Sequence, residues 1–177
     1  MHIKSIPMNE EKEIVNRVAN SPLVTFDLEA LYPEGPRFRI DISQWLEEGL
    51  VLREKAFREA LGAHDWTVYL DGYVSLFCTT DAIVPAWAYL LITSYLNPFA
   101  KLVVAGPPEL LESVAYRDLL EAMDLEPYRD KPVIIKGCSK KEVPQSAYLW
   151  ALEKLQGVAR HVHFGEACSS VPIVRRK

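Results

Sequence analysis

The sequence predicts an α/β protein: a mostly parallel sheet with helices on both faces, preceded by an N-terminal arm and an α/β lead-in segment. Short apolar runs over residues 73–78, 101–106 and 132–138 are typical of buried strands. Each run is followed by a stretch that begins close to a proline and has its apolar side chains at helical spacing. Strands that alternate with helices in this way predict parallel pairing.

The start of the chain gives weaker signals. Residues 9–18 can form a short polar helix, and residues 23–31 fit either an edge strand or an irregular arm. The composition of residues 32–36 is that of a loop. We therefore expect a helix and arm over residues 1–36 and a single α/β domain over residues 37–177.

The lead-in segment reads as a helix followed by a strand. Apolar side chains at helical spacing predict a helix within residues 43–62, which Gly49 can break into two pieces. Residues 66–70 fit a strand, and the dipeptide Asp71-Gly72 that follows is typical of a hairpin turn. An antiparallel pairing with the next strand is therefore expected.

The remaining elements follow in regular order. Helices are expected over residues 85–95, 109–123 and 144–155, and the last strands over residues 158–164 and 171–175.

Charge and composition exclude several classes of protein. The formal net charge of −4 and a pI near 5.6 argue against a nucleic-acid-binding protein, and the basic end Arg175-Arg176-Lys177 is expected to be solvated rather than a phosphate site. The first residues lack the apolar core of a secretory signal, and no apolar run is long enough for a membrane span. These features predict a cytoplasmic protein whose cysteines are free thiols or ligands.

The three cysteines share a position relative to the predicted strands. Cys78 and Cys138 each end a strand, and Cys168 follows the strand that ends at Phe164. Ligands of parallel sheets gather at the carboxyl ends of the strands, so parallel pairing would place all three thiols along one edge. The chain has no CxxC motif of the kind that marks a metal site by its spacing.

Other potential ligands accompany these thiols. His161 and His163 are two residues apart on a strand and share one face, and Glu166 lies just beyond them. A set made of His163, Glu166, Cys138 and Cys168, with Cys78 as a further candidate, could hold zinc, iron or an iron–sulfur cluster. The competing interpretation is structural: Cys78 as a buried core thiol, and the two histidines on a solvated face.

Four stretches of the sequence resemble a known family. They are Cys78–Tyr89, Lys136–Ser139, Val143–Tyr148 and Phe164–Pro172. Together they are similar to the uncharacterised bacterial family called domain of unknown function 2480. The resemblance implies an association with iron–sulfur assembly proteins as partners. The family usually has methionine near the position of His163, which weakens the case for that histidine as a ligand.

Three functions remain open at this point, and the sequence leaves undecided whether the protein is an enzyme. The first is an accessory factor that binds a metal or an iron–sulfur cluster through its thiols. The second is an interaction module without chemistry, with helix aromatics at a partner surface. The third is a thiol enzyme or sulfur acceptor that uses Cys138 or Cys168. The sequence predicts no nucleic-acid or membrane partner and is compatible with a homo-oligomer.

Overall fold

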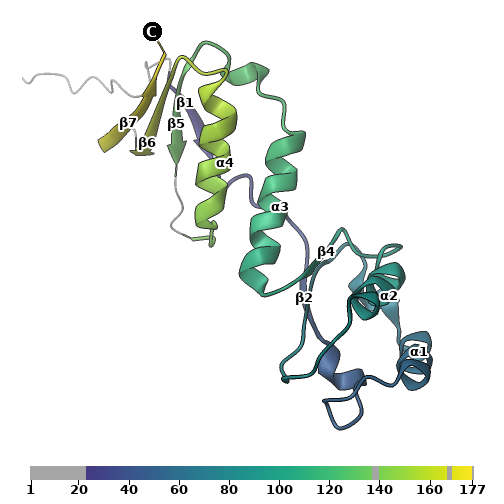
Figure 1. The fold of residues 1–177 in the computed structure, drawn as a ribbon. Helices are drawn as coiled ribbons and strands as arrows, with labels where there is room; N and C mark the ends of the chain where they lie inside the picture. Colours follow the sequence, from purple (N-terminus) through teal and green to yellow (C-terminus); the bar gives the residue numbers. More distant parts are fainter. Residues whose placement is uncertain (1–22, 137–139, 167–168, 177) are drawn as a thin grey trace, which may run out of the picture.

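The structure, a computed structural model, describes residues 23–136, 140–166 and 169–176. In this part of the chain seven strands form two sheets, with the orders β1-β5-β6-β7 and β2-β3-β4. Figure 1 shows the two sheets toward opposite ends of the molecule, with α3 between them. The α/β class and the predominance of parallel pairing are confirmed, and the strands divide between two sheets.

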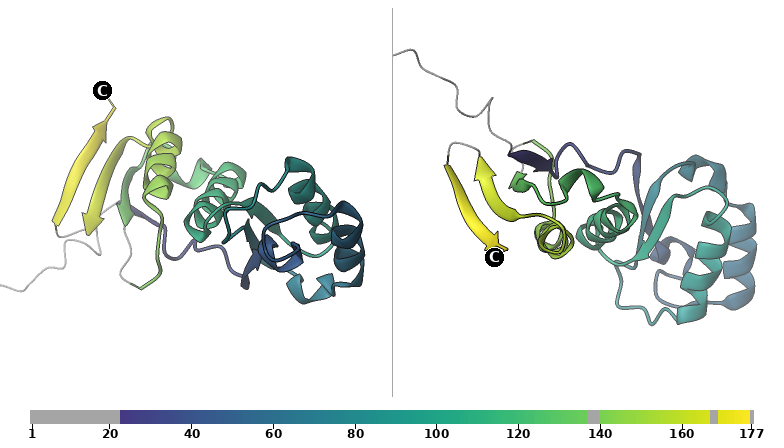
Figure 2. Two further views of the ribbon diagram at one scale, coloured as in Figure 1. Left: turned by 60° about the horizontal axis from the view of Figure 1, so that its bottom comes forward. Right: turned by 90° about the horizontal axis from the view of Figure 1, so that it is seen from above.

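The three-stranded sheet is parallel throughout. Its strands are β2 (Arg37–Asp41), β3 (Tyr73–Phe77) and β4 (Leu102–Ala105). The helices α1 (Glu54–Ala63) and α2 (Ala86–Leu96) pack on it, and Figure 2 shows both at this end of the molecule. Residues of these elements form one hydrophobic cluster of their own.

The four-stranded sheet has a separate core. Its strands are β1 (Val24–Asp27), β5 (Pro132–Lys136), β6 (His161–Glu166) and β7 (Ser169–Arg175). The first three are parallel neighbours, and β7 pairs antiparallel with β6. The segment expected to be an edge strand or an arm is β1, at one edge of this sheet.

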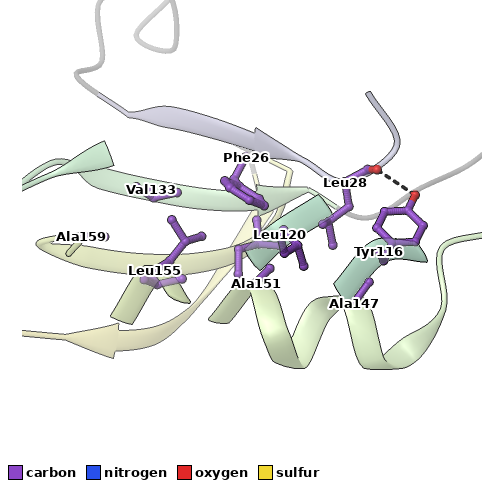
Figure 3. Packing of buried hydrophobic residues seen from close by; sticks show 11 residues of the cluster. Phe26, Leu28, Tyr116, Leu120, Val133, Ala147, Ala151, Leu155 and Ala159 are labelled. Atoms are coloured by element: carbon purple, nitrogen blue, oxygen red, sulfur yellow. Dashed lines mark hydrogen bonds between the residues drawn. The ribbon is translucent and has the colours of Figure 1, made fainter. Parts of the chain in front are cut away.

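Two helices cover one face of the four-stranded sheet. They are α3 (Pro108–Ala122) and α4 (Gln145–Gln156), and their buried side chains meet those of the strands in the cluster shown in Figure 3. Tyr116 of α3 is fully buried there, and its hydroxyl donates a hydrogen bond to the backbone oxygen of Leu28 at 2.9 Å. This bond ties the end of β1 to the helix layer and satisfies a polar group that burial would otherwise penalise.

The lead-in segment departs from the sequence prediction at residues 66–70. These residues form a 3-10 helix, η2 (Trp66–Tyr69), so the predicted strand and hairpin are wrong. The carboxylate of Asp65 accepts a hydrogen bond from the backbone N–H of Thr67 at 3.0 Å, which caps the helical turn. The indole N–H of Trp66 donates to the Leu61 oxygen at 2.9 Å, which folds the segment back on α1. β3 is thus free to pair parallel with both of its neighbours.

The helix expected within residues 43–62 is divided. A short 3-10 helix, η1 (Ile42–Trp45), precedes a turn in which Glu48 and Gly49 have φ angles of 51° and 71°. α1 begins only after this turn, so the expected break at Gly49 is confirmed. The last 3-10 helix of the described chain is η3 (Glu126–Tyr128). The helix expected over residues 9–18 lies outside the described residues.

Candidate functional site

Charged side chains mark the carboxyl edge of the four-stranded sheet. Because β1, β5 and β6 run parallel, their last residues, Asp27, Lys136 and Glu166, lie at the same edge. The Lys136 Nζ is 3.9 Å from the Asp27 Oδ2 and 4.0 Å from the Glu166 Oε1. The lysine therefore stands between two carboxylates, at distances that give weak, partly solvated ion pairs.

The two acidic side chains at this edge differ in how many hydrogen bonds hold them in place. The Asp27 Oδ1 accepts hydrogen bonds from the backbone N–H groups of Glu29 and Ala30, at 3.0 and 3.2 Å, and so closes the turn after β1. The Glu166 side chain is 61% exposed, and its contact with a charged group in the described chain is the distant one with Lys136. Of the two carboxylates, Glu166 is thus the one that can turn toward a ligand.

Two of the predicted ligands lie outside the described residues. Cys138 and Cys168 follow Lys136 and Glu166, respectively, by two positions in the sequence. The structure therefore places the strands that lead to these cysteines, β5 and β6, as parallel neighbours. Whether the thiols converge stays a prediction.

Cys78 does not share this edge. It follows β3, which belongs to the three-stranded sheet at the other end of the molecule, so the predicted alignment with the other strand ends is wrong for this residue. Its thiol is half-buried against the core of that sheet, and its Sγ is 3.4 Å from the Thr80 Oγ1. Sheet membership depends on long-range pairing, which the local strand pattern did not reveal.

Neither histidine lies at the carboxyl end of β6: His161 is the first residue of the strand and His163 lies within it. The His163 Nδ1 is 3.3 Å from the Ser170 Oγ on β7, so the ring engages the neighbouring strand. Burial of the ring and the positive charges of Arg175 and Arg160 lower the pKa of His161. In the described ranges no three His, Cys, Asp or Glu side chains gather as a metal site would require.

A hollow of about 580 Å³ lies between the first turns of α3 and α4. Among its lining residues are Glu109, Glu112 and Glu142, and the Glu112 carboxylate is paired with Arg37 at 2.9 Å. Helix N-termini ordinarily favour anions, but the glutamates oppose one here. This hollow was not predicted from the sequence because its lining residues come from separate segments. The local signals for it are two prolines, Pro108 at the start of α3 and Pro144 just before α4.

The architecture and its charged strand ends define an α/β protein of mostly parallel sheets. The chain belongs to the family described as protein of unknown function (DUF2480), which it matches over residues 12–176. This match confirms the resemblance noted in the sequence. Searches of curated proteins and of solved structures found no match. None of the helices in the described ranges has the length and apolar character needed to cross a membrane.

Proposed function

We propose that this protein is an accessory factor that binds a metal ion or an iron–sulfur cluster at the carboxyl edge of its four-stranded sheet. Cys138 and Cys168 are the thiolate ligands, and Glu166 supplies an oxygen ligand. The observation that supports this site is the parallel pairing of β5 and β6, the two strands whose ends lead into the two cysteines. Cys78 is left out because its strand belongs to the other sheet.

The chemistry of the donor atoms suits the proposed metal ion or cluster. Thiolates favour zinc and iron–sulfur clusters, and a carboxylate can complete a mixed set. Lys136 lies at the same edge and would offset part of the negative charge that two thiolates and Glu166 bring together. His163 is left out of the set because it lies within β6, three residues before the end of the strand at Glu166. The family resemblance suggests iron–sulfur assembly proteins as partners of such a factor.

Metal content after purification without air tests this function. The wild-type protein should carry zinc, or iron with acid-labile sulfide, whereas the double variant Cys138→Ser/Cys168→Ser should carry only traces. Cys78→Ser is the matched control, because it removes a thiol at the other end of the molecule and should retain the metal. A wild-type protein without metal, or a double variant that retains it, would contradict the proposal.

Lys136 also supports a second candidate, a thiol-based function at the same edge. A nearby cation favours the thiolate form and thereby the reactivity of a cysteine, and Lys136 precedes Cys138 by two positions. The rate of alkylation of Cys138, measured against pH in metal-free protein, separates the two functions. A thiol that reacts only near its ordinary pKa of about 8.5 leaves metal binding as the better explanation.

A further inference from the structure

A second charged site lies at the other end of the parallel strands. Asp130, Arg160, His161, Arg175 and Arg176 line a hollow of about 610 Å³. β6 begins at His161 and β7 ends at Arg175, and these two residues are partners in the antiparallel register. The backbone N–H of Arg176 donates to the Arg160 oxygen at 3.1 Å, which continues the pairing by one step. Strand pairing thus brings Arg160 next to Arg175 and Arg176, from which it is distant in the sequence.

These arginines differ from most others in the protein. In the described chain, five arginines each form an ion pair with a glutamate, namely Arg37, Arg53, Arg58, Arg117 and Arg129. Arg160, Arg175 and Arg176 form no ion pair within the same ranges, although the Arg176 Nη1 donates to the Gly157 oxygen at 3.2 Å. The hollow therefore holds three positive charges against the single carboxylate of Asp130.

The field of these arginines reaches the neighbouring ring. Besides its burial, the charges of Arg175, Arg160 and His163 lower the pKa of His161, which favours the neutral form of its imidazole. The His161 Nδ1 is buried and has no hydrogen-bond partner in the described part of the chain. A bound anion would offset this excess of positive charge around the neutral ring.

We propose that this hollow binds a small multivalent oxyanion, with a phosphate group as the moiety that the arginines recognise. Guanidinium groups present paired N–H donors that match phosphate oxygens, and each such bond is charge-assisted. The hollow has the size of a small-molecule site. A nucleic acid is a poorer fit because the whole chain carries a net charge of −4. Asp130 can accept a hydrogen bond from a hydroxyl group of a phosphate ester.

Calorimetric titration with inorganic phosphate, at constant ionic strength set with chloride, tests the site. Arg160→Ala/Arg175→Ala should weaken phosphate binding about tenfold or more, because the charge-assisted hydrogen bonds of two guanidinium groups are lost. Arg53→Ala/Arg117→Ala removes two exposed arginines elsewhere and should leave the affinity within about twofold. The same affinity in the wild type and the Arg160/Arg175 variant, or no binding by the wild type at millimolar phosphate, would overturn the proposal.

Further measurements identify the source of the phosphate group and guard against misfolding. Arg160→Lys/Arg175→Lys keeps the charge without the paired donors, so its thermal unfolding should match the wild type while its phosphate affinity falls. Flotation with phosphatidic acid vesicles, against phosphatidylcholine vesicles, distinguishes a lipid headgroup from a soluble phosphate, and either result upholds phosphate recognition. An oligonucleotide that binds through these arginines while free phosphate does not would reject a small ligand. Metal content is an independent readout, so this site and the proposed metal site can fail separately.

Discussion

Asp41 shows how one carboxylate can join two strand ends. It is the last residue of β2, and its Oδ1 accepts hydrogen bonds from the backbone N–H groups of Ser43 and Thr79, at 3.0 and 3.2 Å. The Thr79 hydroxyl donates to the other oxygen at 2.5 Å. Thr79 follows β3, so this side chain caps η1 and holds the carboxyl ends of neighbouring strands together.

These bonds make stability depend on the charge of Asp41. Burial raises the pKa of this carboxyl, but the hydrogen bonds from Thr79 and Ser43 lower it by more, so the net shift is downward. A lowered pKa in the folded state means that the stabilisation is present above the unfolded value of about 3.9 and is lost as the pH falls through the folded value.

Urea unfolding between neutral pH and about pH 3 measures this contribution. Asp41→Asn should lower the free energy of unfolding at neutral pH and flatten its decline in acid, because the amide cannot titrate. Asp118→Asn, on the exposed side of α3, is the control for the loss of one carboxylate. An Asp41→Asn curve parallel to that of the wild type would show that the bonds of Asp41 do not depend on its charge.

At the scale of elements, local signals carried most of the prediction. Apolar runs and helix-opening prolines located β3, β5 and the helices α2, α3 and α4 to within a few residues. The pattern failed at residues 66–70, where apolar and aromatic residues look like a strand but the cap at Asp65 favours a 3-10 turn. The distribution of strands between two sheets was not predictable, because no local feature specifies which strand pairs with which.

The same limit applies to the candidate sites. Glu166 was named as a candidate ligand because it follows the predicted strand end at Phe164, and the structure makes it the last residue of β6. Its neighbours Asp27 and Lys136 were not predicted, because their meeting depends on which strands pair. The position of Cys78 could not be predicted either, because it required knowledge of sheet membership. The arginine hollow depends on the antiparallel register between β6 and β7, and a solvated tail was expected there instead.

Two glycines give a matched test at the level of elements. Gly72 lies between η2 and β3, and a Cβ atom there would come within 2.4 Å of the Phe38 ring and 2.9 Å of the Tyr69 oxygen. Gly62 lies in α1, and a Cβ atom there would meet nothing within 4 Å. The first glycine is therefore required by a close approach, whereas the second is not.

Alanine at these positions should change stability in opposite directions. Gly72→Ala should cost about 1–3 kcal/mol, because both the ring and the backbone would have to move. Gly62→Ala should stabilise by about 0.5 kcal/mol, since alanine favours an exposed helical position over glycine. Chemical denaturation of both variants provides the measurement, and a neutral Gly72→Ala would mean that Phe38 can move aside at little cost.

At the scale of the whole molecule, α3 and Arg37 connect the two sheets. α3 contributes Tyr116 and Leu120 to the core of the four-stranded sheet and also contacts β3 and β4. From β2, the guanidinium of Arg37 pairs through two bonds with Glu112 of α3, at 2.9 and 3.0 Å. Its Cζ lies 4.5 Å from the ring centres of both Tyr32 and Tyr73. One half-buried cation thus contacts residues associated with both cores.

This connection predicts that the two sheets unfold as one unit and that Arg37 helps to couple them. Arg37→Ala should lower stability by about 2 kcal/mol, because it leaves the Glu112 carboxylate without its partner in a partly buried position. A double-mutant cycle with Glu112→Ala should give a coupling energy of about 1 kcal/mol. Arg117→Ala, which breaks an exposed pair on the same helix, is the control and should cost less than about 0.5 kcal/mol.

Hydrogen exchange at increasing urea concentration can follow peptides from β3 and β5 separately. In the wild type both should lose protection at one midpoint, as expected for a single cooperative unit. In Arg37→Ala the two midpoints should separate, because the contact that makes each core depend on the other is gone. Separate midpoints already in the wild type would show two independent domains. A common but lower midpoint in the variant would show that α3 alone couples the sheets and that Arg37 contributes only to local stability.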